Sequence, residues 1–307
     1  MPKVSVIIPT HNRAEFIGRA INSVLTQTFK DFELLVVDDA STDRTRQVVN
    51  QIGDDRIRFI AHKVNKGGSA ARNTGIKQTE GNYVAFLDDD DEWLPNKLER
   101  QVALLDIARK EVGAVYSGFY LVMNSNSCVV AKSLPYHEGD LYSELLQHNV
   151  IRNTTTVIVR RECLEKCGLF DERLPSCQDW EMWIRIARHY QFLFIKDALA
   201  RIYIHGKQIS GHLDDKIAAR ERIIDKYYFE LHKNKFAFSM HLKKLGGLCC
   251  LANDWKKGMR YFLKSIINQP KQRDSYLLVL YGLVARERQK NLIETTLTTR
   301  MHGIQLF

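Results

Sequence analysis

The chain has 307 residues, of which 45% are hydrophobic, as expected for a globular protein with one large domain and a smaller one. No apolar segment approaches the ~20 residues that span a bilayer, and the first apolar run, Val4–Ile8, is too short for a signal peptide. The formal net charge is +9, and the six cysteines form no Cys-x-x-Cys pair, which argues against zinc and disulfides and favours reduced thiols in a cytoplasmic protein.

The first 120 residues alternate apolar runs with helical patterns. Runs rich in β-branched and aromatic residues predict strands at Val4–Ile8, Phe32–Val37, Arg56–Ala61, Tyr83–Leu87 and Val112–Phe119. Apolar residues at helical spacing predict helices over 14–27, 44–52 and 95–109, and the segment 65–73 opens another. This alternation predicts βαβ units and a mostly parallel α/β sheet with helices on both faces. We expect Ser41 or Thr42 to cap one helix and Pro95 to occupy the first turn of another.

Two of these predicted strands end in acidic residues. Asp38 and Asp39 follow one strand, and the run Asp88–Asp91 follows another. Because ligands bind at the carboxyl ends of parallel strands, both acidic groups are expected to flank one crevice. Closely spaced carboxylates repel one another, and their hard oxygens suit Mg²⁺ or Mn²⁺, ions that also bind substrate phosphates. The alternative is an acidic turn before a helix, where the helix dipole favours negative charge.

Residues 120–150 carry few signals, and the pattern resumes beyond them. A strand, a short helix and a closing strand are predicted at Thr154–Val159, Arg161–Cys167 and Asp197–Ile204. Between these, Trp180, Trp183 and Ile184 fall on one helical face, which places Asp179 at the start of that helix. The first-turn N–H groups would keep its carboxylate ionised, although a plain N-cap is the alternative.

Four segments of the chain resemble the motifs of the family 2 glycosyltransferases of GT-A fold, in order and spacing over residues 3–205. They are Val4–Asn12, Val36–Asp43, Gly67–Asn73 and Phe86–Asp91. The resemblance implies a Rossmann-like GT-A domain, here placed at residues 1–210. It also implies inverting, Mn²⁺- or Mg²⁺-dependent transfer of a sugar from a nucleotide-diphosphate sugar, expected to be a UDP-sugar. The acceptor would be a saccharide or lipid-linked hydroxyl in cell-surface polysaccharide biosynthesis.

The resemblance also implies roles for individual residues. Residues that would contact the donor are Pro9, Thr10, His11, Asn12, Asp38, Asp39, Arg72, Asp88 and Asp89. Asp90 would bind the metal, with Asp88 or Asp89 as its partner and His205 as a further ligand. Asp179 would deprotonate the acceptor hydroxyl, and Trp93, Gln178 and Trp180 would lie on the acceptor side. The family usually has Glu where this chain has Gln178, a change that leaves the base in place but removes one negative neighbour.

Plainer interpretations stand beside these roles. Asp38 and Asp39 could cap a turn, Arg72 could be a solvated helix residue, and His205 could be structural. A nucleotidyltransferase also combines an α/β sheet with acidic metal ligands, but it usually has a glycine-rich loop where this chain has Pro9–Asn12. A catalytically inactive scaffold with a partner-binding helical tail is the other alternative.

The last third of the chain differs in charge from the rest. Residues 201–307 hold 20 Lys/Arg against 9 Asp/Glu, and we expect a basic helical region over 211–307. The pattern of Ile217–Leu231 predicts an amphipathic helix. The offsets of Leu245, Gly246, Gly258, Phe262 and Pro270 resemble one tetratricopeptide unit, and we expect a small helical bundle. The pairs Lys243–Lys244 and Lys256–Lys257 and the apolar run Tyr276–Ala285 predict peripheral contact with the anionic inner face of the plasma membrane. That run could instead pack on the first domain. No nucleic-acid partner is expected.

Overall fold

The computed structural model describes residues 1–205, 212–271 and 276. These residues divide into two compact units. Unit 1 comprises residues 1–145, 149–172 and 178–205, and unit 2 comprises residues 146–148, 173–177, 212–271 and 276. Within these ranges, no helix is both long and apolar enough to cross a membrane.

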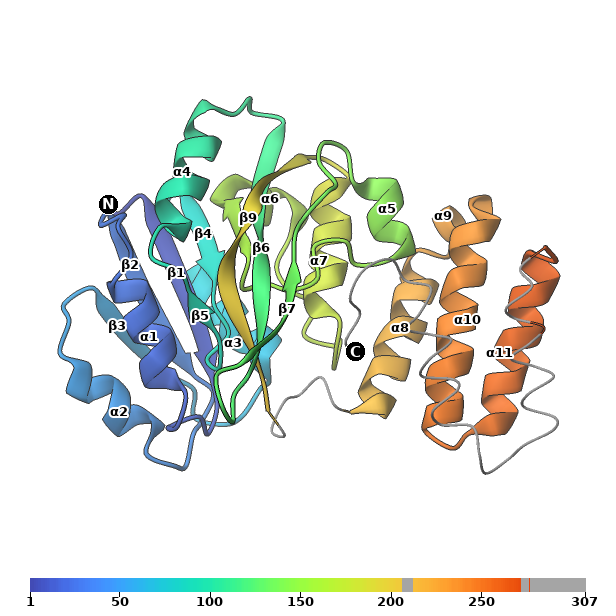
Figure 1. The fold of residues 1–307 in the computed structure, drawn as a ribbon, viewed down its shortest axis with the longest axis horizontal. Helices are drawn as coiled ribbons and strands as arrows, with labels where there is room; N and C mark the ends of the chain where they lie inside the picture. The colour runs from blue at the N-terminus through green and yellow to red at the C-terminus, as the bar shows by residue number, and fades with distance from the viewer. Residues whose placement is uncertain (206–211, 272–275, 277–307) are drawn as a thin grey trace. The chain divides into compact units, whose positions relative to one another are not determined.

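Unit 1 is built on a mixed sheet. Its strands are β1 (Val4–Thr10), β2 (Phe32–Asp38), β3 (Ile57–Ala61), β4 (Tyr83–Phe86), β5 (Glu92–Trp93), β6 (Val112–Met123), β7 (Val129–Ser133), β8 (Val157–Arg160) and β9 (Gln191–Ile204). They lie in the order β3-β2-β1-β4-β8-β6-β9-β5, with β7 paired to β6 (Figure 1). β1 runs parallel to both β2 and β4, and β2 runs parallel to β3. The predicted mostly parallel α/β sheet is therefore confirmed, and the carboxyl ends of β2 and β4 flank that of β1.

Helices pack on both faces of this sheet. The helices of this part of the chain are α1 (Ile17–Leu25), α2 (Thr45–Ile52), α3 (Gly68–Lys77), α4 (Lys97–Ile107), α5 (Tyr142–Gln147), α6 (Arg161–Cys167) and α7 (Gln178–Ala187), and the end of α5 belongs to unit 2. Side chains alternate along β1 because strand residues point to opposite faces in turn. Val6 and Ile8 lie in a buried cluster with apolar residues of α1 and α4. Ile7 faces α3, where a Cβ at Gly75 would lie only 2.6 Å from the Ile7 side chain, so glycine allows this close approach.

Several predicted boundaries are corrected by the structure. The cap expected from Ser41 or Thr42 is wrong, because α2 begins at Thr45 and both residues instead bind the neighbouring loop. Pro95 precedes α4 by two residues rather than lying in its first turn. β6 runs past its predicted end at Phe119 to Met123, and β9 begins at Gln191, before its predicted start at Asp197. The weakly patterned stretch 120–150 contains both β7 and α5.

Unit 2 contains α8 (Leu213–Lys226), α9 (Tyr228–Lys233), α10 (Lys235–Leu251) and α11 (Trp255–Asn268). The single helix predicted over Ile217–Leu231 is therefore two helices, separated at Tyr227. α10 and α11 pack as a hairpin in which Gly246 lies against Phe262 and Gly258 against Cys250. Apart from Tyr276, the apolar run expected to touch the membrane lies outside the described residues.

Candidate active site

The loops that follow β1 and β2 are bound to each other. The Asn12 Oδ1 atom accepts hydrogen bonds from the backbone N–H groups of Thr42 and Asp43, at 2.8 and 3.3 Å. The Asn12 N–H donates to the Ser41 Oγ atom at 2.8 Å. Asn12 and Ala40 have φ angles of 54° and 61°, in the left-handed region that non-glycine residues rarely adopt. Such backbone strain persists only where surrounding contacts fix it, and here those contacts come from the opposite loop.

Asp38 and Asp39 are the residues that join these loops to the sheet. The Asp38 carboxylate accepts hydrogen bonds from the Ser41 N–H and hydroxyl. The Asp39 carboxylate accepts from the N–H groups of Lys66 at 2.9 Å and Gly67 at 2.6 Å, and from the His62 Nδ1 atom at 2.7 Å. Both carboxylates are buried. They hold three loops in place at the carboxyl edge of the sheet, and direct contact with a donor stays a prediction.

The acidic run after β4 separates into two kinds of position. Asp89 and Asp91 are buried, whereas Asp88 and Asp90 are partly exposed. Asp91 accepts hydrogen bonds from the Thr155 hydroxyl at 2.7 Å and the Tyr203 N–H at 3.2 Å, so its contacts lie within the protein. The sequence left open whether Asp88 or Asp89 accompanies Asp90, and this burial pattern favours Asp88.

Basic side chains from other elements surround the run. Arg72, in α3, contacts Asp88 with a 2.5 Å distance from its Nη2 to the carboxylate. His205, which follows β9, has its Nε2 2.9 Å from the Asp90 carboxylate. Arg13 lies 3.7 Å from Asp89. Two arginines and an imidazole, from three separate segments, therefore contact the negatively charged run.

A third arginine, Arg19 of α1, binds the backbone of the run. Its guanidinium donates to the Asp90 carbonyl at 2.5 Å and lies over the Tyr203 ring at 3.5 Å. Arg13 and Arg19 were not expected from the sequence as site residues. Both are ordinary polar positions beside or within a helical stripe, and only tertiary folding brings them to the acidic run.

Crowding and burial change the acidity of these carboxyl groups. Burial raises the pKa of Asp89 to about 7, and the neighbouring Asp90 charge adds to this effect. Burial and the Asp88 charge raise the pKa of Asp90, which the His205 hydrogen bond partly offsets. Burial raises the pKa of Asp91 well above its usual value. A cation placed between Asp88 and Asp90 would relieve their repulsion.

The donor set fits a divalent cation of the Mg²⁺ or Mn²⁺ type. Asp88 and Asp90 offer hard carboxylate oxygens, and His205 offers an imidazole nitrogen beside them. Over residues 1–205, 212–271 and 276, no group of three or more His, Cys, Asp or Glu side chains is arranged to hold a metal ion, so Asp88, Asp90 and His205 do not form a complete site by themselves. Mg²⁺ commonly binds through one or two protein carboxylates and completes its coordination with substrate phosphates and water, so an open pair of carboxylates suits it.

Asp179 lies in the first turn of α7, as predicted. The Asn149 Nδ2 atom donates to its carboxylate at 3.2 Å. Burial raises the pKa of Asp179 to about 6, while the positive charge of Arg72 lowers it and the negative charge of Asp88 raises it. Arg72 therefore acts on both Asp88 and Asp179, which places the acidic run and this carboxylate in one electrostatic site. Asn149 was not expected from the sequence.

Trp93 and Trp180, which the sequence placed on the acceptor side, are buried in the structure, and a role beside the acceptor stays a prediction. Each residue is 2% exposed. The Trp93 indole N–H donates to the Thr155 carbonyl at 2.7 Å, and the Lys97 ammonium lies 3.9 Å from its ring centre. The Trp180 indole N–H donates to the Leu145 carbonyl at 2.7 Å. Both rings fill the core, because they lie on the inward faces of β5 and α7. Gln178 is half-buried in the first turn of α7.

The sequence comparison identifies the family. The family described as Glycosyl transferase family 2 matches residues 5–168, which is more than half of the chain. With the sheet and the acidic site described above, this match shows that the chain belongs to family 2 of the glycosyltransferases.

Proteins with similar sequences are also described as glycosyltransferases. The chain is 34% identical over 214 residues to an uncharacterized glycosyltransferase of Rickettsia prowazekii, covering 68% of this chain and 66% of that protein. It is 36% identical over 185 residues to the Escherichia coli UDP-Glc:alpha-D-GlcNAc-diphosphoundecaprenol beta-1,3-glucosyltransferase WfgD, covering 60% of this chain and 70% of that protein. In longer relatives from Rickettsia felis and Rickettsia conorii, the match spans only 37% and 36% of their length.

Solved structures show the same fold. The S. aureus TarS fragment 1–349, in complex with UDP-GlcNAc, has a TM-score of 0.69 and 23% identity, covering 92% of this chain and 87% of that one. The mannosyltransferase PcManGT from Pyrobaculum calidifontis, in complex with GDP-Man and Mn²⁺, has a TM-score of 0.62 and 19% identity, covering 96% and 84%. At these identities the likeness concerns the fold, which is the GT-A architecture expected from the sequence.

Proposed function

We propose that this protein is a metal-dependent, inverting glycosyltransferase that uses a UDP-sugar as donor. The acceptor would be a hydroxyl of a saccharide or a lipid-linked sugar in cell-surface polysaccharide biosynthesis. The Escherichia coli relative acts with UDP-Glc on a diphosphoundecaprenol-linked sugar, and the S. aureus neighbour binds UDP-GlcNAc, which supports a UDP-sugar over other donors.

The observation that carries this proposal is the position of Arg72. Its guanidinium contacts Asp88 at the end of the acidic run, and its charge also acts on Asp179. A cation close to both groups would reduce the repulsion between a bound diphosphate and an ionised base, because both are negative. Arg72 therefore has the right placement to face the donor phosphates.

The metal would be held by Asp88 and Asp90, with His205 as a further ligand. Mn²⁺ bound to the structural neighbour from Pyrobaculum calidifontis supports this choice of ion. When bound, such an ion would stabilise the negative charge that develops on the diphosphate leaving group.

The base would be Asp179, which takes the proton from the acceptor hydroxyl. With a pKa of about 6, its carboxylate is mostly ionised at neutral pH yet more basic than an ordinary aspartate. The hydrogen bond from Asn149 would fix the orientation of that carboxylate. One placed base without a second carboxylate nucleophile favours direct displacement, and therefore inversion at the anomeric carbon.

The donor nucleotide would lie over the interlocked loops that follow β1 and β2. Pro9–Asn12, Asp38 and Asp39 form the wall of this region. Because protein N–H groups and His62 already bind the Asp39 carboxylate, we expect that residue to shape the pocket and to offer a base or ribose at most one remaining acceptor position. Asp89, which is buried beside Arg13, would support the same wall from within.

The test is slow hydrolysis of nucleotide sugars without an acceptor. A panel of UDP-, GDP- and dTDP-sugars is incubated with the full chain, with Mn²⁺ or with a chelator, and release of the nucleoside diphosphate is measured. We expect release from one or a few UDP-sugars that requires the metal. Equal release with the chelator would exclude metal dependence, and release from GDP-sugars alone would exclude the proposed donor class.

A further inference from the structure

The outward face of α11 combines positive charge with exposed apolar side chains. Its exposed residues are Lys256, Arg260, Leu263, Lys264 and Ile267. At 3.6 residues per turn they fall within an arc of about 100° around the helix axis. The buried residues Gly258, Phe262 and Ser265 occupy the opposite side and pack within unit 2.

We call these five exposed residues of α11 the outer stripe. Its two apolar side chains are unusually accessible to solvent. Leu263 is 50% exposed and Ile267 is 76% exposed. Single exposed apolar residues are common on protein surfaces. Here, however, two of them stand one turn apart on the same face as three cations, with no acidic residue in the stripe. An amphipathic helix that lies in a membrane interface has this combination of cations and apolar side chains.

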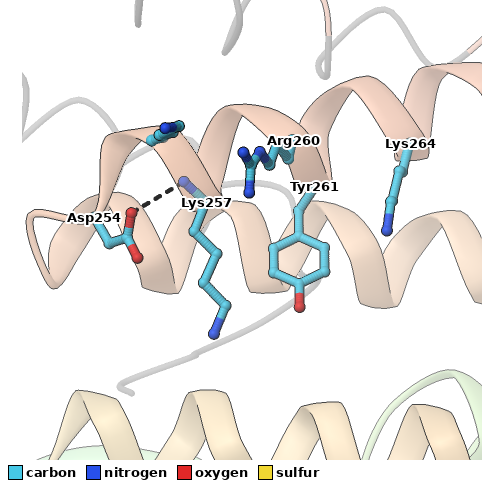
Figure 2. Close-up of a pocket in the computed structure, with 6 residues that line it drawn as sticks. Asp254, Lys257, Arg260, Tyr261 and Lys264 are labelled. Atoms are coloured by element: carbon cyan, nitrogen blue, oxygen red, sulfur yellow. Dashed lines mark hydrogen bonds between the residues drawn. The ribbon is translucent and has the colours of Figure 1, made fainter.

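A shallow cavity beside the stripe extends the positive charge. Its volume is ≈ 390 Å³, and its lining includes Lys256, Lys257, Arg260 and Lys264, with Asp254 as the acidic member. Figure 2 shows Lys257, Arg260 and Lys264 projecting from successive turns of α11. Asp254 caps the helix by accepting from the Lys257 N–H, and the Lys257 ammonium binds Glu221 of α8 at 2.8 Å. Among the described residues, no acidic side chain forms an ion pair with Lys256, Arg260 or Lys264, although the Lys264 ammonium lies 5.9 Å from the Tyr261 ring centre. These three cations can therefore face phosphate groups.

We propose that the outer stripe of α11 docks the protein on an anionic membrane surface. Lipid phosphates would meet the three cations while Leu263 and Ile267 enter the boundary between headgroups and acyl chains. A soluble polyanion would satisfy the cations but would leave both apolar side chains in water. The chain's own segment 277–307 is a poorer occupant, because it carries 4 Lys/Arg against 2 Asp/Glu.

The test uses the full chain and sedimentation with vesicles of phosphatidylcholine, with or without phosphatidylglycerol. We expect binding only to the anionic vesicles, and loss of binding in high salt because surface charges are screened. The triple variant Lys256→Glu, Arg260→Glu, Lys264→Glu should bind at least on the order of 100-fold more weakly, since each cation near an anionic leaflet contributes roughly 5-fold. The matched control Lys30→Glu, Arg109→Glu, Lys110→Glu changes the same number of exposed charges in unit 1 and should bind much more tightly than the triple variant.

A second variant separates a membrane from a soluble polyanion. Leu263→Ser with Ile267→Ser should weaken vesicle binding several-fold and leave binding of soluble inorganic polyphosphate unchanged. Circular dichroism would verify that each variant is folded. Three results would overturn the proposal: no anionic-vesicle binding by the wild type at low salt, equal losses in the triple variant and its control, or unaltered vesicle affinity in the Leu263/Ile267 variant. Because sugar transfer is not measured, the outcome is independent of the proposed catalytic function.

Discussion

Asp179 differs from an ordinary surface aspartate in both its contacts and its acidity. Its position in the first turn of α7 was predicted, but its hydrogen bond from Asn149 and its raised pKa come from the packing around it. A carboxylate whose pKa approaches neutrality is a stronger base than one at the usual value, and it is still largely ionised near pH 7. The proposed role therefore depends on this environment.

We expect Asp179→Asn to lower turnover by ~10²-fold or more while leaving donor affinity nearly unchanged, because only the proton acceptor is lost. In the wild type, activity should fall as the pH drops through about 6, since the base becomes protonated. A cation bound at Asp88 would shift this fall in activity to lower pH, because a nearby positive charge stabilises the ionised form of Asp179. Steady-state kinetics against pH and a donor-binding titration would check both points.

The control is Asp197→Asn, which removes an exposed carboxylate that pairs with Arg100. It should change neither quantity appreciably. Parallel losses of donor affinity and turnover in Asp179→Asn would instead indicate a structural or metal-binding role.

The acidic run shows how four identical side chains acquire different roles. Asp88 and Asp90 are partly exposed, whereas Asp89 and Asp91 are buried. Asp91 binds the Thr155 hydroxyl and the Tyr203 N–H, so it serves to hold the run in place. We therefore assign the proposed metal contacts to the exposed pair.

Single substitutions to Asn should separate these roles. Asp88→Asn and Asp90→Asn should each lower Mn²⁺-dependent donor hydrolysis on the order of 10²-fold or more, the scale for losing a placed electrostatic contact. Asp89→Asn should cost less activity, because that side chain faces Arg13 inside the protein. Hydrolysis rates over a Mn²⁺ titration would measure this. A larger effect in Asp89→Asn than in Asp88→Asn would reverse the assignment.

At the scale of elements, glycines allow helices to approach one another closely. In the α10–α11 hairpin, a Cβ at Gly258 would lie 2.5 Å from the Cys250 sulfur and 2.9 Å from the Gly246 carbonyl oxygen. The second contact is with backbone, which cannot rotate away. In α1, by contrast, a Cβ at Gly18 would meet only Val48 at 3.6 Å, an ordinary contact.

These two glycines therefore predict opposite effects of the same substitution. Gly258→Ala should destabilise the protein, because overpacking costs ~1–3 kcal/mol and outweighs the better helix propensity of alanine. Gly18→Ala should be neutral or stabilising by up to about 1 kcal/mol, since only the propensity changes. Thermal melts of both variants would test this. A stabilising effect of Gly258→Ala would show that the hairpin is packed more loosely than described.

At the scale of the whole molecule, the strand order places the site. β1 lies between β2 and β4 and runs parallel to both, so the segments after these three strands meet at one edge of the sheet. Such a switch point is where open α/β sheets bind their ligands. α7 and the segment after β9 then contribute Asp179 and His205 from distant parts of the sequence.

A site assembled in this way should bind metal and nucleotide cooperatively. We expect UDP and Mn²⁺ together to raise the melting temperature by more than the two separate shifts combined, because the diphosphate completes the coordination that the two carboxylates begin. A ligand present at 100 times its dissociation constant stabilises the folded state by about 2.7 kcal/mol, which is enough to shift the melting temperature measurably. Differential scanning fluorimetry of the wild type and Asp90→Asn would test this. Synergy that survives in Asp90→Asn would argue against a metal held there.

The sequence by itself determined the fold class, the family and the position of Asp179. Those inferences rest on local properties: strand and helix periodicity, acidic residues after strands, and four motifs in register. The sequence did not reveal that Trp93 and Trp180 are buried, because an aromatic residue beside a functional motif has the same local pattern whether it faces a ligand or the core. It also missed β7 and α5, whose short segments carry too little periodicity to stand out.

Only the tertiary structure decided which acids are accessible and which side chains face them. The run Asp88–Asp91 is uniform in sequence, and its division into exposed and buried positions depends on Thr155, Tyr203 and Arg13, which lie far from it along the chain. The same is true of the raised pKa of Asp179, since burial is a property of the packed molecule. Chemistry that depends on desolvation and on charges brought together by folding is not encoded in any local pattern.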